Sequence, residues 1–577
     1  MRTARNLVAV ITAATLLGGL VLASEGPTIR PDGGTFDGPM MVAVTPPGRE
    51  YSLRVTVDGS DPAFEPYSLD GSRPMTQSYA IKAPFRLASS ATVKARMFKA
   101  DKTPAGPIRE SRFTIKPKLR PGVPFYPVDW NADVETWWKG HALNPKSPQL
   151  FAGAVQSPSF RVNVAEIRER HPESTTAGID EALAMAPPEG GTLWFPKDCG
   201  PYVITKADSA VRLRSGYLWG GAIKIRRRNN LHFLSDGATI RCDHTAFGIA
   251  GDEIDKYGQV EHPATNFYFN NLVFDGHGKA GSEMLFMQEG ENFHILNTSD
   301  VLFDDCRFVG SVAPKMGHGG LLSIAFKSDN IWCRHCHFDS GLWGVYWDGV
   351  HGGGLVNCTF GNRFTNGGFV LFTNDDLSPF DFRLREAQYI VVAGCTFGQT
   401  DETRIYLNPT AWNMSASNCL FVDNTVNRAY RTGLFMNAKI CPDFRPYRYH
   451  ATGNRIIGNR FDGVDTLLVV EAKIVPKTHP YRIGNLLVRD NTADGLETFL
   501  ETRHQAGLPK IHDIEVANNR LRGPRLPRLV VQGGGIEGLR IKDNLLAGET
   551  RSLVASQDGA LPAGAVILSG NRSESNP

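Results

Sequence analysis

The chain has 577 residues, a formal net charge of +3, 59 glycines and nine cysteines. The balanced charge, with no basic block and no acidic tail, argues against a nucleic-acid partner and against a disordered acidic segment. Abundant glycine and short apolar runs favour a turn-rich all-β protein, and a solenoid can absorb this length because each coil packs only on its neighbours.

Residues 1–23 are predicted to be a signal peptide. Arg2 and Arg5 precede an uncharged run from Leu7 to Leu22, and the run ends in Val21-Leu22-Ala23, a pattern that signal peptidase accepts. The alternative is a retained membrane anchor, but the apolar run is shorter than the ~20 residues that a bilayer requires. We therefore expect a secreted or periplasmic protein without a membrane partner.

Residues 24–117 are predicted to form a small β-sandwich. Gly, Pro, Asp and Ser separate short apolar or alternating runs, which indicate strands at Met40–Val44, Ser52–Val57, Phe85–Leu87 and Thr92–Phe98. Three segments resemble, in order, the fibronectin-like module at the C-terminus of chitobiases: Pro31-Asp32-Gly33-Gly34, Val57-Asp58-Gly59-Ser60-Asp61-Pro62 and Ala91-Thr92-Val93-Lys94-Ala95-Arg96. An accessory or spacer role is favoured over sugar binding, because no exposed aromatic platform is evident.

Residues 118–156 are rich in proline and lack a sustained period, so we expect a linker that packs along the larger domain. Its three indoles, Trp130, Trp137 and Trp138, either pack against the end of the solenoid or stack on carbohydrate. Residues 157–577 are predicted to form the solenoid. A helical pattern from Ile179, followed by strand-like runs, resembles the opening of the pectate-lyase-type β-helix superfamily, in which a helix caps the first coil.

An internal repeat carries the fold prediction. Five segments share a Cys-x-Phe frame: Asp305–Phe308, His335–Phe338, Asn357–Phe360, Gly394–Phe397 and Asn418–Phe421. Later segments have an asparagine at the corresponding position: Asn459, Asn491, Asn519, Asn544 and Asn571. Spacings of roughly 22–37 residues suit coils of three strands. The column of Asn or Cys resembles the ladder of right-handed parallel β-helices, and we expect that fold.

Five of the nine cysteines fall in this ladder, where a thiol acts as a small apolar filler and no disulfide is needed. Cys333–His337 also spells the haem c attachment motif. The ladder frame argues against haem, because Cys336 shares its position with four other coils. Residues 333 and 336 of one strand would also point to opposite faces.

Four segments resemble, in order, the catalytic motifs of the polygalacturonase family: Asn297–Asp300, Asp304-Asp305, Gly317-His318-Gly319 and Arg404-Ile405. The ladder frame contradicts this resemblance. Asp304 and Asp305 directly precede ladder Cys306, whereas the acids of that family lie on a different strand of the coil. The spacing is also compressed, so this assignment is rejected.

The strand before each coil's first turn ends in a polar residue. Stacked at about 4.8 Å per coil, these residues are predicted to form a polar column at the mouth of a groove: Asp348, Asn374, Asn408, Asn437, Glu471 and Glu501. Two residues further on, Lys439, Lys473 and Arg503 would form a cationic column. The polysaccharide lyases and hydrolases of this fold resemble one another in that they place their catalytic groups on this face.

Asp348, Asp375 and Asp376 are predicted to be the catalytic residues, because carboxylates one coil apart can serve an inverting hydrolase as acid and base. Aromatic rings beside them, Tyr346 and Trp347, suit the face of a sugar ring. The remaining predicted substrate-binding residues are Asn374, Arg404, Asn408, Asn437, Lys439, Glu471 and Lys473. The alternative is that such acids and amides only cap turns.

The sequence therefore predicts a secreted, monomeric carbohydrate-active enzyme whose partner is a polysaccharide, with a hydrolase slightly favoured over a lyase. A lyase needs a basic residue, for which Lys439, Arg404 or Lys473 could serve, and cationic or Ca²⁺ support; a hydrolase is expected to need no cofactor. Arginines in the middle of the solenoid favour an acidic polysaccharide: Arg383, Arg385, Arg428, Arg431, Arg445 and Arg448. The rival is a non-catalytic glycan-binding or cell-surface β-helix protein.

Overall fold

The computed structural model divides the chain into two compact units, Met1–Lys116 and Pro117–Pro577. Within the residues it describes, no helix is long and apolar enough to cross a membrane. These residues are 26–36, 40–56, 59, 61–64, 79–80, 85–87, 91–115, 158–207, 211–212, 218–251, 264–280, 293–296, 298–311, 320–325, 328–372, 387–398, 410–427, 432–437, 451–472, 483–506, 510–549, 552–556, 561 and 564–574. The predicted signal peptide and the linker tryptophans lie outside them.

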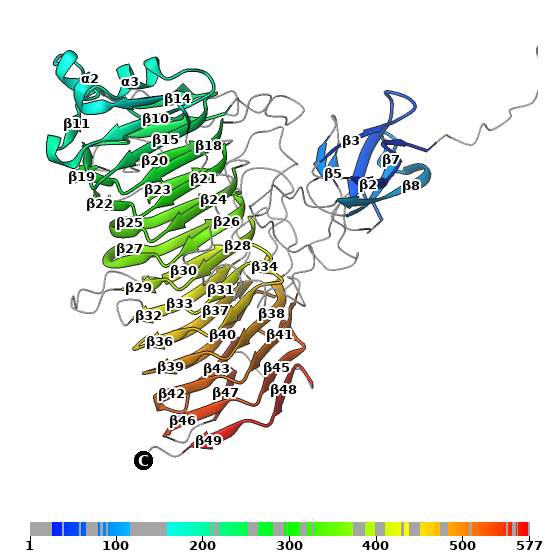
Figure 1. Cartoon of the computed structure of the whole chain (residues 1–577). Helices are drawn as coiled ribbons and strands as arrows, with labels where there is room; N and C mark the ends of the chain where they lie inside the picture. The colour runs from blue at the N-terminus through cyan, green and yellow to red at the C-terminus, as the bar shows by residue number, and fades with distance from the viewer. Residues whose placement is uncertain are drawn as a thin grey trace, which may run out of the picture. The chain divides into compact units, whose positions relative to one another are not determined.

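The first unit is a β-sandwich of a three-stranded and a five-stranded sheet (Figure 1). Alternation along its strands buries one residue in two, so that Val55 of one strand and Ala95 of its antiparallel partner are fully buried. The smaller sheet has the order β1 (Thr28–Arg30), β3 (Met40–Thr45), β6 (Phe85–Leu87), and the larger β2 (Gly34–Phe36), β8 (Pro104–Ile115), β7 (Ala91–Phe98), β4 (Ser52–Thr56), β5 (Tyr79–Ala80).

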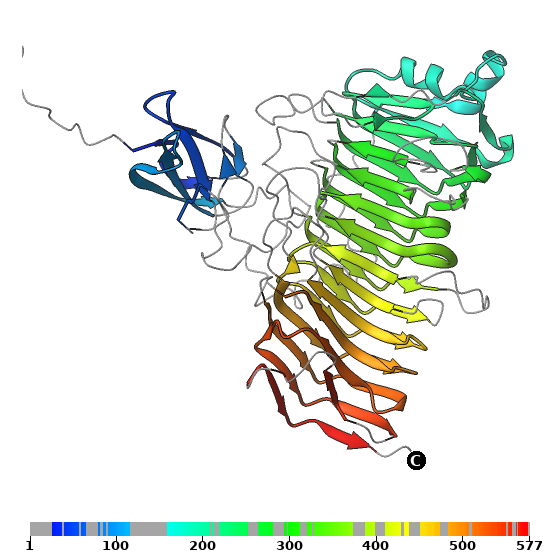
Figure 2. The ribbon, with the colours of Figure 1, turned by 180° about the vertical axis from the view of Figure 1, so that it is seen from behind.

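The second unit is a right-handed parallel β-helix, as the repeat predicts. The sheet that precedes the ladder turn in each coil, here called sheet A, has 16 strands within the described residues, all paired in parallel (Figures 1 and 2). They are β9 (Arg161–Asn163), β10 (Gly191–Phe195), β15 (Asn229–Ser235), β18 (Ala264–Asn270), β21 (Thr298–Asp304), β24 (Asp329–Arg334), β26 (His351–Val356), β28 (Gln388–Ala393), β31 (Leu420–Val422), β34 (Ala451–Thr452), β35 (Arg455–Ile457), β38 (Ile483–Arg489), β41 (Ile511–Ala517), β44 (Ile536–Glu537), β45 (Leu539–Lys542) and β48 (Val566–Ser569).

In the part of the chain that the structure describes, a second sheet of 23 strands completes the coils and contains two columns. Column B follows the ladder turn: β11 (Tyr202–Ile204), β16 (Thr239–Cys242), β19 (Val273–Ala280), β22 (Arg307–Ser311), β29 (Thr396–Phe397), β32 (Thr425–Asn427), β36 (Arg460–Asp462), β39 (Thr492–Asp494), β42 (Arg520–Arg525), β46 (Leu545–Glu549) and β49 (Arg572–Glu574). Column C precedes sheet A: β14 (Ile223–Arg226), β17 (Phe247–Ala250), β20 (Phe293–Leu296), β23 (Gly320–Ala325), β30 (Thr410–Ser415), β33 (Thr432–Asn437), β37 (Thr466–Ala472), β40 (Thr498–His504), β43 (Arg528–Gln532) and β47 (Val554–Ser556).

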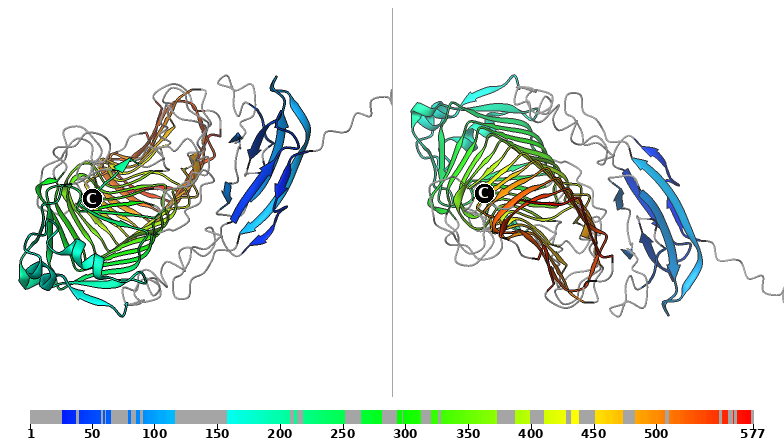
Figure 3. Two further views of the ribbon diagram at one scale, coloured as in Figure 1. Left: turned by 90° about the horizontal axis from the view of Figure 1, so that it is seen from above. Right: turned by 90° about the horizontal axis from the view of Figure 1, so that it is seen from below.

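Two long strands, β25 (His337–Asp348) and β27 (Thr359–Phe372), run through both columns. Successive coils lie over one another when the molecule is seen from above and below (Figure 3). A short antiparallel pair, β12 (Val211–Arg212) and β13 (Leu218–Trp219), stands apart from both large sheets.

Two short helices cover the first coil. The expected helix from Ile179 is present as α3 (Ile179–Met185), and a further helix, α2 (Val164–Arg170), begins at Asn163, whose side chain accepts a hydrogen bond from the Ala165 backbone N–H. The inward faces of both helices are buried with the core of the first coils. A 3₁₀ turn, η2 (Lys197–Cys199), follows β10, and Arg168 of α2 donates to the Cys199 carbonyl oxygen. The helices thus shield apolar interior that the end of a solenoid would otherwise expose.

The ladder is continuous from Cys306 to Asn571 and changes from thiol to amide; in the two preceding coils Ala238 and Leu272 hold the same position. Its rungs are Cys306, Cys336, Cys358, Cys395, Asn424, Asn459, Asn491, Asn519, Asn544 and Asn571. Four of the five predicted cysteines hold this position. Cys419 does not: its N–H bonds to Asn454 at a different turn. Asn424, which was not predicted as a rung, follows Cys395 in the ladder.

Each rung follows a residue with left-handed backbone. Asp305, His335 and Asn357 have φ near +54°, and glycine takes the same place at Gly394 and Gly458. The backbone N–H of each of these residues bonds to a carbonyl oxygen of the next coil, for example Asp305 to Arg334 and His335 to Val356. The side chain that follows then points into the core, which is why a Cys or Asn at this position is buried.

A column of phenylalanine rings stacks beside the thiol rungs. Ring centroids are 5.0 Å apart from Phe308 to Phe338, 5.0 Å from Phe338 to Phe360, and 4.6 Å from Phe360 to Phe397, close to the spacing of the coils. All four rings are fully buried. The Cys-x-Phe frame of the sequence is therefore a double column of core residues.

The eight cysteines that the structure describes are free thiols, and Cys441 lies outside the described residues. Cys333 and Cys336 do not point to opposite faces, as strand alternation predicts; both are buried, because the chain turns at His335 between them. Burial raises the pKa of both thiols. Attachment of a haem to the two sulfurs would require displacement of the core around them.

The amide rungs should stabilise the fold more than the thiol rungs. Asn491→Ala removes four hydrogen bonds with buried partners, so we expect a loss of about 4 kcal/mol in the free energy of unfolding. Cys358→Ala removes a buried sulfur whose S–H is only a weak donor, to the Cys333 and Val356 carbonyl oxygens, and should cost about 1 kcal/mol. Equilibrium urea unfolding measures both, and equal losses would contradict the assignment of hydrogen-bonded rungs.

His232 on β15 lies on the outer side of sheet A, yet it is fully buried, and neither ring nitrogen has a hydrogen-bond partner. Burial lowers its pKa to about 4. The folded chain therefore resists protonation that the unfolded chain accepts below about pH 6.5, and stability should fall by about 3 kcal/mol as the pH drops from 6.5 to 4. His232→Leu should lack this component of the pH dependence, measured by urea unfolding at both pH values; an unchanged profile would contradict it.

Candidate functional site

The predicted line of polar residues at the ends of the column C strands exists in part, but the strands pair in a register that differs from the predicted one. Asp348 pairs with Phe372, and not with Asn374, because β25 and β27 pair two residues earlier than predicted. Asn437 and Glu471 are paired as predicted. Glu471 in turn pairs with Arg503. Glu501 therefore lies two residues before the column on its strand, opposite Val469.

The corrected column lies on one line of the parallel register. Phe372 pairs with Ser415, and Arg503 pairs with Gln532. The predicted cationic column is therefore wrong for Arg503, which belongs to the polar column itself. Over the seven consecutive coils from β25 to β43, the line is Asp348, Phe372, Ser415, Asn437, Glu471, Arg503 and Gln532.

Trp347 was predicted to contact substrate, and the structure corrects this. Its side chain is fully buried, and its ring packs edge-on against Phe369 with the centroids 5.2 Å apart. The alternation of β25 turns Val345 and Trp347 into the core and leaves Tyr346 half-buried on the outer side. An outward tyrosine next to an inward tryptophan was misread as an aromatic pair on one face.

Most other predicted site residues cannot be placed. The structure describes the backbone of Asp348 at the end of β25 and of Asn437 at the end of β33, but not their side chains. The following residues lie outside the described part of the chain: Asn374, Asp375, Asp376, Arg404, Asn408, Lys439 and Lys473. Their roles remain predictions.

The best-defined part of the column is a network on β37, β40 and β43. Glu501 accepts hydrogen bonds from Arg503 Nε at 2.8 Å and from Gln532 Nε2 at 2.7 Å, and Arg503 Nη1 lies 3.6 Å from Glu471 Oε1. The side chains are 20% exposed for Glu471, 15% for Glu501 and 38% for Arg503. Three adjacent coils thus present a partly exposed polar surface whose side chains are fixed by hydrogen bonds and an ion pair.

The charges in this network largely compensate one another. Burial lowers the pKa of Arg503, but the hydrogen bond and charge of Glu501, with the charge of Glu471, outweigh this and raise it. The guanidinium is therefore shared between two carboxylates and is not available as a free cation. The arrangement suits hydrogen bonding to sugar hydroxyls better than capture of a sugar carboxylate.

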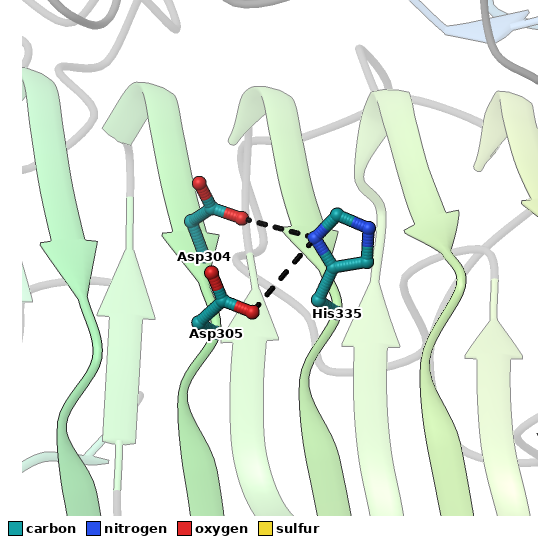
Figure 4. A group of neighbouring side chains, drawn as sticks. All are labelled: Asp304, Asp305 and His335. Carbon is teal, nitrogen blue, oxygen red and sulfur yellow. Dashed lines mark ion pairs between the residues drawn. The ribbon is translucent and has the colours of Figure 1, made fainter. Parts of the chain in front are cut away.

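A second cluster lies at the ladder turn at the end of sheet A. Asp304 ends β21, Asp305 follows it, and His335 follows β24 on the next coil, with its ring directed at both carboxylates (Figure 4). His335 Nδ1 is 3.6 Å from Asp304 Oδ1 and 3.9 Å from Asp305 Oδ1. Asn357 Nδ2 faces His335 Nε2 at 3.5 Å, a contact that fits the neutral ring with its proton on Nδ1.

Asp304 is held by Arg334, the residue beside it on the next coil. Arg334 Nε donates to Asp304 Oδ1 at 2.7 Å, Arg334 Nη2 contacts Oδ2, and Tyr268 OH donates to Oδ2 at 3.4 Å. Burial lowers the pKa of Arg334, but the hydrogen bond and charge of Asp304 outweigh this and raise it. Burial, with the negative charge of Asp304, raises the pKa of exposed Asp305.

The ligand atoms of Asp304, Asp305 and His335 lie within 4.8 Å of one another, a spacing that a metal ion could span. Arg334 already engages both oxygens of Asp304, however, and would place its positive charge next to the ion. With His335 neutral, the four side chains carry one net negative charge. These residues fit a structural ion pair at a turn better than a metal centre.

Both aspartates lie at the ladder turn, on the strand that the ladder frame predicts, and column C contributes neither of them. Asp305 and His335 occupy consecutive left-handed turn positions, a conformation in which Asp, Asn and His are enriched. Their proximity thus has a structural cause. Sequence reasoning did not find the ion pair of Asp304 with Arg334, which the ladder spacing would have indicated.

No family model matches the chain, and no curated protein matches it. Among solved structures it is similar to the A-module of a mannuronan C-5 epimerase from Azotobacter vinelandii (15% identity, 71% of this chain, 99% of that chain, TM-score 0.36). It is also similar to the catalytic unit of an α-1,3-glucanase from Streptomyces thermodiastaticus (10%, 92%, 88%, 0.42) and to a surface adhesin of Streptococcus pneumoniae (14%, 72%, 90%, 0.31). The β-helix of this chain rests on its own strand pairing, and similarities at this level say nothing about its reaction.

The ion pair at the ladder turn gives a test of its structural role. Arg334→Met leaves the buried Asp304 carboxylate without its partner, so we expect a loss of about 3 kcal/mol in the free energy of unfolding. The double variant Asp304→Leu with Arg334→Met replaces both charges with apolar groups and should recover most of that loss. Urea unfolding of the three proteins measures this, and a double variant no more stable than Arg334→Met would contradict it.

Proposed function

We propose that this chain is an exported carbohydrate-active enzyme that binds a polysaccharide along the outer face of column C. The observation that carries the proposal is the register, which places Asn437, Glu471, Arg503 and Gln532 on one line over four coils. Coils repeat at about 4.8 Å, so such a line offers hydrogen bonds at regular intervals along an extended chain of sugars. Glu471, Glu501 and Arg503 are partly exposed and held in fixed positions, as a binding surface requires.

We favour glycoside hydrolysis over elimination. In this proposal Asp348, on the same line of column C, acts with Asp375 or Asp376 as the acid and base, and the network of Glu471, Glu501 and Arg503 holds sugar hydroxyls. A lyase would need a free cation for the enolate that forms next to a uronate carboxyl. Arg503 is compensated by two carboxylates, which weakens that alternative at this part of the column. Ca²⁺ would enter only with the lyase, through residues yet to be assigned.

The other unit is proposed to be an accessory module. The chitobiase-type resemblance and the predicted signal peptide both fit an exported protein that acts outside the cytoplasm, with residues 24–117 serving as a spacer. The rival proposal is a non-catalytic glycan-binding or cell-surface protein, for which the same polar line would bind sugar without an acid and base. Product formation separates these proposals.

Activity assays should distinguish the two faces of the solenoid. The mature chain is incubated with a panel of neutral and acidic polysaccharides, and both reducing ends and the absorbance of unsaturated uronates are recorded. On the substrate that is cleaved, Asp348→Asn and Asp375→Asn should lower the rate by about 10²–10⁴-fold, since each removes an ionisable group but preserves shape.

Asp305→Asn is the matched control, because it changes an exposed carboxylate at the ladder turn. Full activity of Asp348→Asn and Asp375→Asn with an inactive Asp305→Asn would place the reaction at the ladder turn and overturn the proposal. Binding without product from any polysaccharide would favour the rival, and unsaturated products would identify a lyase.

A further inference from the structure

The outer side of sheet A carries a buried apolar surface. On six successive strands from β21 to β35, one residue points into the solenoid core, and its two neighbours point outward because side chains alternate along a strand. Most of these outward residues are apolar and at most 7% exposed, although none belongs to the core cluster. They are Leu302, Trp332, Val356, Val391, Ala393, Leu420, Val422 and Ile457, here called the outer patch.

The register joins the outer patch into one surface. On one outward line Leu302 pairs with Trp332, and Val391 pairs with Leu420. Gly354 stands between the two pairs and leaves room for the indole, because a Cβ at this position would lie 3.1 Å from Trp332 Cζ3. A second outward line runs beside the first. An apolar surface that extends over six coils is rarely left bare in a soluble protein.

Neighbours within the sheet do not explain the burial of the outer patch. Leu487 stands on the same line one coil beyond the patch and has a paired strand on each side, yet it is only half-buried. Further along that line, Ile567 is 50% exposed. Among the described elements, no helix or strand packs over the patch. Its burial therefore requires a cover from outside the sheet.

Three of the coils that carry the patch have no loop of their own to cover it. Residue 297 alone joins column C to β21, residues 326–328 lead into β24, and residues 349–350 lead into β26. The ladder turns that follow these strands are as short. The cover of Leu302 and Trp332 must therefore come from another part of the chain.

Residues 117–157, which lie outside the described residues, are long enough to supply the cover. They run directly into β9, the first strand of sheet A, and contain six aromatic residues. From β9 to β35 the sheet takes nine strand-to-strand steps of about 4.8 Å, whereas an extended chain covers about 3.3 Å per residue. Less than half of the segment therefore suffices to reach the far end of the patch.

The chemistry of this segment also matches the patch and its border. Pro121, Pro124 and Pro127 recur every three residues, a pattern typical of an extended polyproline conformation that needs no strand partner. Residues 129–138 contain three acidic residues and no basic one. Arg455, which is 8% exposed, stands beside Leu420 on the outward line. The negative charge of the segment thus complements the positive charge at this end of the patch.

The other long stretches that lead into sheet A nearby are less suited to an apolar surface. Residues 252–263, which precede β18, carry five charged side chains among twelve residues. Residues 373–386, which precede β28, carry six among fourteen. Residues 118–156 carry seven among 39 and include three of the nine tryptophans of the chain. Burial favours the segment with the fewest charges for its length.

We propose that residues 118–156 lie over the outer patch of sheet A, with Trp130, Trp137 and Trp138 against its apolar side chains. The segment is then part of the fold of the solenoid and not a free tether between the two units. Its indoles are buried in this contact and do not stack on carbohydrate. The outer patch is separate from column C, so this inference does not depend on the proposed reaction.

Photo-cross-linking identifies the occupant directly. Trp332 is replaced by p-benzoylphenylalanine, also aromatic, in the full mature chain, and cross-linked peptides are identified by mass spectrometry after irradiation and proteolysis. We expect cross-links to peptides from residues 118–156. The matched control carries the same group at Ile567, on the same line of sheet A but 50% exposed, and should give several-fold less cross-linked product.

Each other outcome at position 332 would overturn the proposal. Cross-links to residues 252–263 or 373–386 would identify a loop of the solenoid as the cover. Cross-links between two chains would identify a second copy. Equal yields at positions 332 and 567, or none at position 332, would show that nothing specific lies over the patch.

A second measurement tests the indoles without a cross-linker. The double variant Trp137→Ala with Trp138→Ala should unfold several degrees below the wild type and bind several-fold more of the dye ANS, because the apolar patch becomes exposed. The double variant Trp137→Phe with Trp138→Phe keeps aromatic rings and should stay close to the wild type. An unchanged midpoint and unchanged dye binding in the alanine variant would contradict the proposed contact, since indoles on a free tether stabilise nothing.

Discussion

Everything in the solenoid depends on the hydrogen bond that crosses from one coil to the next at the ladder turn. The left-handed residue before each rung sends its N–H to a carbonyl of the following coil, and this fixes both the spacing and the inward direction of the next side chain. Because parallel coils repeat at one spacing, a residue at any position meets a residue of the same position above and below. Side chains at equivalent positions of successive coils must therefore be able to pack or bond with one another. Rings stack, amides donate and accept in series, and a lone charge needs a partner one coil away.

This constraint explains what the sequence could predict. The Cys-x-Phe frame and the later asparagines identified the ladder because residues at such a turn must be alike, and Ile179 identified the capping helix from its helical period. Cys419 was assigned to the wrong turn because Asn418-Cys419-Leu420-Phe421 has the same letters in the same order, while the true rung, Asn424, lies five residues later. Local pattern cannot distinguish two turns that bury the same kinds of residue.

The groove was harder to predict because its register depends on loops of unequal length. Alignment by the last polar residue of each strand placed Glu501 beside Glu471, whereas pairing places Arg503 there, two residues later. A shift of two keeps inward and outward faces unchanged, so the hydrophobic pattern could not reveal the error. Trp347 was misplaced for a different reason: a large ring next to an acid resembles a sugar platform, but alternation along β25 turns it inward.

The change from thiol rungs to amide rungs between Cys395 and Asn424 divides the solenoid into two kinds of interior. Toward the cap, the coils cohere through sulfur and stacked phenylalanine rings; toward the C-terminus, the ladder turns cohere through buried amide hydrogen bonds. Apolar cohesion weakens on cooling, because the hydration of apolar surface changes with temperature much more than amide pairing does. The ladder of one continuous fold thus contains a part whose cohesion weakens in the cold and a part that keeps it, although both parts share one apolar core, and the boundary lies at a single turn.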